Sequence, residues 1–175
     1  YCNRKGYAPE FAVPFLHKAV EIAPNAKIAL VFPAKILTNT QSTSQKFRDF
    51  LLKECYVERV YNLSILRKAP KQHGGNLFTS AVGPVGIIFY QATKPRKESR
   101  TITYWAPKTI IKNHIAEGVV IDSSDVKFLP REECYKPNSK IWKVAMWGSM
   151  EDYEIIEKVL NSNKKTFKDY LKKFN

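Results

Sequence analysis

The run of apolar residues from 28 to 32 is the feature that most constrains the fold of this chain. A nearly continuous apolar run of strand length indicates a strand buried on both faces, as in a parallel sheet. Pro33 stops the run well short of the roughly 20 residues that a membrane-spanning helix needs. We therefore expect a fold built on a buried sheet, with no membrane span.

A helical pattern precedes this strand. Phe11, Phe15, Ala19 and Ile22 follow one another at spacings of four, four and three residues. This spacing predicts one apolar stripe of an amphipathic helix that starts near Pro9.

A second helix and a second strand follow the apolar run. Phe47, Phe50 and Leu51 indicate the helix, and residues 55–63 are predicted to form the strand. The order helix, strand, helix, strand implies a three-layer α/β sandwich.

Two further strands are predicted at residues 85–90 and 101–105. The charged turn at residues 94–100 joins them, and a connection this short suggests an antiparallel hairpin at the edge of the sheet. The polar, basic stretch 64–83 has neither helical nor strand periodicity, and long loops of this kind are often functional or mobile.

The composition and the pattern of the sequence change near Pro107. The sequence becomes polar and irregular, and helical patterns return at residues 150–160 and 166–174. We therefore place a boundary there, with residues 1–106 as one unit and an α-rich appendage at residues 107–175.

Positive charge is the clearest functional signal in the composition. The chain has 29 Lys and Arg against 16 Asp and Glu, a net charge of +13, while its 44% hydrophobic content argues against a disordered protein. Six basic residues fall within 94–112 and five lysines within 164–173. Such clusters attract a phosphate backbone, although a solvated lysine-rich surface gives the same pattern.

Familiar catalytic and metal-binding motifs are absent from the sequence. It contains no GxGxxG, GxSxG, HExxH or Walker lysine. Cys2, Cys55 and Cys134 lack the spacing of metal ligands, so we expect reduced thiols in a cytoplasmic protein and no metal site.

The order and spacing of the segments resemble the second half of the catalytic domain of site-specific adenine-N6 DNA methyltransferases of restriction-modification systems, type IIG-like or related. The similar segments are the helix at 9–23, the strand and proline at 26–37, the FR..LL helix at 47–52, the strand at 60–64, the aromatic at 76–78 with the strand at 85–90, and residues 141–148 with Asp152. The last of these resembles the connection to a target-recognition region.

The resemblance implies a partial Rossmann-like methyltransferase sheet with a C-terminal antiparallel hairpin. Residues 1–106 would be the C-terminal half of the catalytic domain, and residues 107–175 the connector and the start of the DNA-recognition region. The family's glycine-bearing turn for S-adenosylmethionine and its Pro-Pro-aromatic motif are absent, since none of the ten prolines adjoins another.

Both motifs would lie upstream of Tyr1. The resemblance thus implies a fragment without catalytic residues that is inactive and binds no cofactor alone, whereas the full-length protein uses S-adenosylmethionine. Its partners would be double-stranded DNA and the missing N-terminal half of the same polypeptide.

The resemblance also implies site residues. Phe78 is placed where the family has a second residue that stacks on the extruded base, although a loop aromatic can equally pack onto the sheet. The candidate DNA contacts are Arg67, Lys68, Lys71, His73, Arg96, Lys97 and Arg100. A non-catalytic basic nucleic-acid-binding module is the alternative, and an interaction domain with an incidental lysine-rich face is a third possibility.

Overall fold

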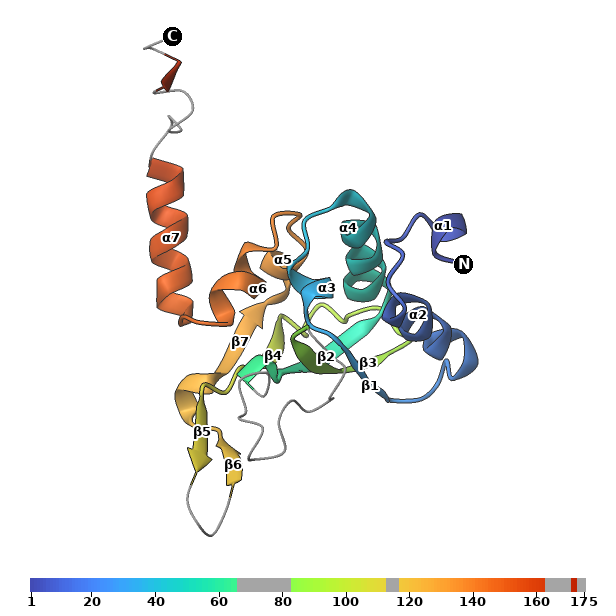
Figure 1. Ribbon diagram of the computed structural model, residues 1–175. Coiled ribbons are helices and arrows are strands. Elements are labelled where there is room, and N and C mark those ends of the chain that lie inside the picture. The colour runs from blue at the N-terminus through green and yellow to red at the C-terminus, as the bar shows by residue number, and fades with distance from the viewer. Residues whose placement is uncertain (66–82, 113–116, 163–170, 173–175) are drawn as a thin grey trace.

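The computed structural model describes residues 1–65, 83–112, 117–162 and 171–172 (Figure 1). They form a mixed five-stranded sheet with helices packed against it, so the expected α/β class is confirmed. None of the described helices combines the length and apolarity that crossing a membrane requires.

The main sheet has the strand order β1, β3, β2, β4, β7. The bounds of these strands are β1 Ile28–Pro33, β2 Tyr56–Asn62, β3 Val85–Gln91, β4 Thr101–Trp105 and β7 Val126–Pro130. Strand β3 pairs antiparallel with both β1 and β2, β4 pairs parallel with β2, and β7 pairs antiparallel with β4. Strands β1, β2 and β4 therefore run in the same direction, with β3 inserted between the first two.

The predicted hairpin between residues 85–90 and 101–105 is wrong. Both segments are strands, but β2 lies between β3 and β4, and the 92–100 connection crosses the end of β2. A short connection limits how far apart two strands can lie. Because neighbouring strands are about 4.8 Å apart, two strands separated by a third are only about 10 Å apart, and a short connection can span that distance.

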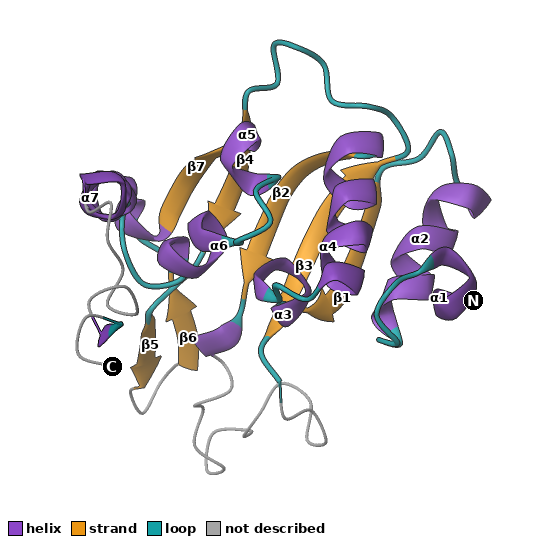
Figure 2. Cartoon of the chain, turned by 90° about the horizontal axis from the view of Figure 1, so that it is seen from above, coloured by secondary structure: helices purple, strands orange, loops and turns teal. Residues whose placement is uncertain are grey.

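Helices α2 to α6 all cover one face of the sheet (Figure 2). The helices are α1 Cys2–Lys5, α2 Ala12–Ile22, α3 Lys35–Thr38, α4 Ser42–Asp49, α5 Arg131–Cys134, α6 Lys140–Ala145 and α7 Met150–Ser162, and a π-helical turn at Phe50–Glu54 extends α4. The described residues thus form two layers rather than the expected three. On the other face, Tyr61 packs against Trp105 and Phe89, with ring centroids 5.2 and 5.6 Å apart.

The core lies between this helical layer and the sheet. Leu16 of α2, Phe47 of α4 and Trp142 of α6 are buried against Ile88 and Tyr104 of the sheet. Two of its buried polar side chains are hydrogen-bonded: the Arg48 guanidinium donates to the carbonyls of Ile36, Asn39 and Pro137, and the Tyr90 hydroxyl donates to Leu16 O at 2.7 Å.

The apolar stripe predicted for the first helix faces outward. Phe15 is 70% and Ile22 is 80% exposed, and Phe11 precedes the helix. The stripe that packs on the sheet consists instead of Val13, Leu16, His17 and Val20. His17 is buried within this stripe, and its ring centroid lies 4.2 Å from that of Phe50.

Strand β1 is not buried on both faces as the sequence suggested. It pairs with β3 alone among the described strands, so it lies at the edge of the sheet. Phe32 on the helical face is buried, whereas Ala29 and Val31 on the other face are exposed.

Residues after 106 do not form a separate appendage, although helices α5, α6 and α7 make up much of this segment. Strand β7 completes the main sheet, and a small second sheet follows from β5 Thr109–Lys112 and β6 Glu117–Val120. The predicted helix at residues 150–160 is confirmed as α7, while most of the helix predicted at 166–174 lies outside the described residues.

Candidate functional site

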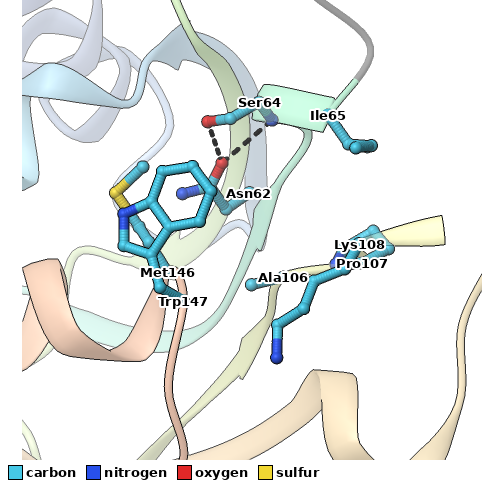
Figure 3. A pocket seen from close by; sticks show the side chains of 8 residues that line it. All are labelled: Asn62, Ser64, Ile65, Ala106, Pro107, Lys108, Met146 and Trp147. Carbon is cyan, nitrogen blue, oxygen red and sulfur yellow. Dashed lines mark hydrogen bonds between the residues drawn. The ribbon is translucent and has the colours of Figure 1, made fainter. Parts of the chain in front are cut away.

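A pocket opens at the ends of β2 and β4 (Figure 3). These two strands run parallel, so their carboxyl ends share one edge of the sheet, the place where open α/β sheets commonly bind ligands. The pocket holds about 240 Å³ and is lined by Asn62, Ser64, Ile65, Ala106, Pro107, Lys108, Met146 and Trp147. We call it the β2–β4 pocket.

Asn62, the last residue of β2, forms the polar floor. Its side-chain oxygen accepts a hydrogen bond from Ser64 N at 3.0 Å and another from the Ser64 hydroxyl, and its Nδ2 donates to the Tyr104 hydroxyl at 2.6 Å. The Ser64 amide can only donate, which fixes Oδ1 toward the turn and Nδ2 toward Tyr104. An amide nitrogen carries two hydrogens, so one remains for a ligand.

Tyr104 supports Asn62 from the neighbouring strand. It is 1% exposed, and its ring meets the edge of Trp142 with centroids 5.7 Å apart. Burial raises the pKa of its hydroxyl strongly, against a smaller lowering by the hydrogen bond from Asn62. Tyr104 is therefore neutral at physiological pH and acts as a fixed support.

Trp147 forms the rim of the pocket on the turn between α6 and α7. Its indole is 71% exposed, which is unusual for so large an apolar side chain. The backbone beneath it is held firmly. Gly148 N donates to Val144 O at 2.7 Å, and Ser149 N donates to Asp152 Oδ2 at 2.7 Å. These bonds fix the backbone of the turn that carries the ring.

Two lysines make this region positive. Lys108 lines the pocket and is exposed, while Lys127 of β7 is only 4% exposed and its Nζ has no hydrogen-bond partner among the described residues. Burial lowers the pKa of Lys127, and the charge of Lys108 lowers it further, whereas Asp125 and Asp122 raise it. The ammonium groups of Lys127 and Lys108 are therefore close enough to interact electrostatically.

Chemically, the site is suited to binding. Among the described residues, its lining combines an amide, a hydroxyl, an ammonium and an indole, with no carboxylate and no thiol. No cluster of His, Cys, Asp or Glu in the described part of the chain could hold a metal ion.

The sequence-predicted site residues fall into two groups. Arg67, Lys68, Lys71, His73 and Phe78 lie outside the described residues. Their roles therefore stay predictions.

Arg96, Lys97 and Arg100 lie in the connection between β3 and β4, beside the start of β2. The β2–β4 pocket lies beyond the other end of β2, and a seven-residue strand is about 23 Å long. The structure therefore does not bring these three residues to the pocket.

Sequence reasoning missed Asn62 and Trp147 as site residues. Asn62 was counted within a predicted strand, and Trp147 within a short aromatic segment. The available signal was a polar amide at the end of a predicted strand.

No family model matches the chain, and no curated protein matches it. Among solved structures, the chain is similar to the M protein of the type I restriction enzyme EcoKI, with a TM-score of 0.42 and 13% sequence identity over 55% of this chain. The match covers 19% of the M protein chain, so the chain spans only a small part of that protein's length.

Proposed function

We propose that this chain is part of an S-adenosylmethionine-dependent adenine-N6 DNA methyltransferase of a restriction-modification system, to which it contributes a wall of the target-base pocket and contacts to DNA. The observation that carries the proposal is spatial. Three of the segments that resemble this family, residues 26–37, 60–64 and 85–90, supply adjacent strands of one sheet, β1, β2 and β3. The net charge of +13 further supports a DNA partner.

The flank of the sheet beside β1 supports a further unit of the catalytic domain as partner. The edge of β1 that no described strand covers carries no charged residue, and its one proline, Pro33, is the last residue of the strand, whereas edge strands are usually protected by charges, prolines or bulges. Helix α2 lies on the β1 side of the sheet (Figure 2). Phe15 and Ile22 of this helix and Val31 of β1 are exposed. A strand pairing with β1, with helices of its own on both faces, would cover these apolar side chains.

The proposal assigns the cofactor and the chemistry to that further unit. S-adenosylmethionine would supply the methyl group. The residues of the β2–β4 pocket do not fit this cofactor, because they include neither a glycine-bearing turn nor a carboxylate to hold sugar hydroxyls. The 175-residue chain is therefore proposed to bind no S-adenosylmethionine and to transfer no methyl group alone.

The test uses the full-length polypeptide that contains this chain. Methyl transfer from labelled S-adenosylmethionine to duplex DNA is measured, and the product is digested to nucleosides to identify N6-methyladenine. Methylation of adenine supports the proposal. DNA binding without methyl transfer would overturn it and favour the alternative, a non-catalytic basic nucleic-acid-binding module.

Phe78 offers a narrower test of the base-stacking role. With 2-aminopurine at the target adenine, Phe78→Ala in the full-length polypeptide should reduce the fluorescence increase that accompanies base extrusion. Phe128→Ala is the matched control, because Phe128 is 62% exposed on β7, on the sheet face opposite the helices. Equal fluorescence from the two variants would show that Phe78 does not stack on the extruded base.

A further inference from the structure

Three side chains of the β2–β4 pocket carry groups that could bind a ligand and that do not contribute to holding the fold together. Trp147 presents an indole face to solvent, Asn62 retains one amide hydrogen, and Lys108 carries an ammonium at the rim. We propose that this pocket binds one nucleotide unit, with its base stacked on Trp147, an edge of the base bonded to Asn62 and its phosphate beside Lys108.

The shape and apolar character of the pocket favour a flat ring. A volume of about 240 Å³ is small, and Ile65, Ala106, Pro107 and Met146 make most of the lining apolar. Indole faces stack on any base, because every base has a π-face. Figure 3 shows the Trp147 ring and Asn62 together in the view, with Ala106, Pro107 and Lys108 across the pocket from them.

The polar groups discriminate a base from a plain hydrocarbon ring. Nδ2 of Asn62 is a donor, and the Ser64 hydroxyl, which donates to Asn62, keeps its own lone pairs as acceptors. These groups are held by the hydrogen bonds to Tyr104 and within the 62–64 turn, so little ordering is required when a ligand binds. A base edge offers matching donors and acceptors.

The charge at the rim favours an anionic ligand. Lys108 is exposed at the pocket, and Lys127 is buried without a hydrogen-bond partner among the described residues. Asp122 and Asp125 lie near enough to act on Lys127, but neither lines the pocket. A phosphate would therefore meet an ammonium and no carboxylate in the lining.

This inference rests on the proposed function for the source of the nucleotide, namely a strand of DNA that leaves the duplex near the target base. A free nucleotide has the same chemistry. The 175-residue chain is titrated with three probes: dAMP, a single-stranded ten-nucleotide DNA, and a strand of the same length in which every position is abasic. Binding is followed by fluorescence anisotropy of labelled DNA and by calorimetry for dAMP.

Trp147→Ala should weaken binding of single-stranded DNA about tenfold, and Trp147→Phe should restore most of it. Lys108→Ala should weaken binding and reduce the slope of log affinity against log salt by about one. Phe128→Ala and Lys143→Ala are matched controls, since both residues are exposed away from the pocket lining. They should bind as the unmodified chain does, apart from a small loss of charge attraction in the lysine variant.

Equal binding by Trp147→Ala and Phe128→Ala would overturn the proposal. Loss of affinity for the fully abasic strand supports a base of DNA as the ligand, whereas tight binding of dAMP with no gain for the strand supports a free nucleotide. The inference and the proposed function can fail separately. A full-length Trp147→Ala protein that methylates normally would refute nucleotide binding in the β2–β4 pocket alone. A full-length protein that transfers no methyl group would refute the proposed function alone.

Discussion

The side-chain amide of Asn62 donates a 2.6 Å hydrogen bond to the hydroxyl of Tyr104, joining two parallel strands beneath the β2–β4 pocket. Both side chains are buried. The bond therefore links the stability of the sheet to the shape of the pocket floor.

Tyr104→Phe should lower the free energy of unfolding by about 1–2 kcal/mol, because it removes the acceptor and leaves a buried amide hydrogen unbonded. Its ring contact with Trp142 is retained. Urea unfolding followed by circular dichroism measures the loss. Tyr135→Phe, at a half-buried position directly after α5, is the control and should change stability by less than about 0.5 kcal/mol. Equal losses in the two variants would contradict the role of the Asn62 bond.

Lys127→Met should raise the free energy of unfolding by about 1 kcal/mol or more at pH 7, because it removes a buried ammonium that lacks a partner among the described residues. The pKa of Lys127 is lowered in the folded state. Between this folded pKa and the ordinary value near 10.4, the unfolded chain therefore binds more protons than the folded chain does. In that pH range, Lys127 makes the free energy of unfolding rise with pH.

The advantage of Lys127→Met over the unmodified chain should accordingly shrink as the pH approaches 10.5. Urea unfolding at pH 7 and at pH 10.5 measures both values. Lys143→Met, an exposed position on α6, controls for the loss of one charge. A pH-independent gain would show that packing, and not relief of the buried charge, is the cause.

Gly86→Ala should destabilise the fold by about 1–3 kcal/mol. A Cβ at Gly86 would lie 2.9 Å from both Phe32 Cε1 and the backbone oxygen of Tyr61, and the backbone cannot move aside easily. Gly83→Ala is a matched control, because a Cβ there meets nothing within 4 Å. Thermal unfolding of the two variants distinguishes the effects, and a loss as large in Gly83→Ala would refute the steric account.

The three cysteines should differ in reactivity toward a disulfide reagent at pH 8. Cys2 is half-buried, whereas Cys55 and Cys134 are buried free thiols. Burial raises the pKa of Cys55 to about 11 and that of Cys134 further, so few of these thiols are thiolates. One thiol should react quickly in the native protein and all three in denaturant. Rapid native reaction that survives Cys2→Ser would contradict this order.

The sequence was sufficient to locate β1, β2, β3 and β4, because apolar runs bounded by turns are local signals. It did not predict which strands pair, because pairing depends on contacts between distant segments. Strand β7 was missed altogether, since Lys127 and the adjoining polar residues concealed a strand whose Leu129 is fully buried.

The candidate site was less accessible to sequence reasoning than the fold. Asn62, Lys108 and Trp147 come from three distant segments, and only the parallel pairing of β2 with β4 and the docking of α6 bring them to one pocket. The predicted basic contacts Arg96, Lys97 and Arg100 were grouped by charge alone, and charge carries no information about which end of a strand a turn occupies.

The insertion of β3 between β1 and β2 has a consequence for the growing chain on the ribosome. Strands β1 and β2 are made first, but they cannot pair with each other in their final positions, because each forms its hydrogen bonds with β3. The sheet can close only after residue 91 has emerged, and until then the apolar faces of both strands need protection from other nascent chains.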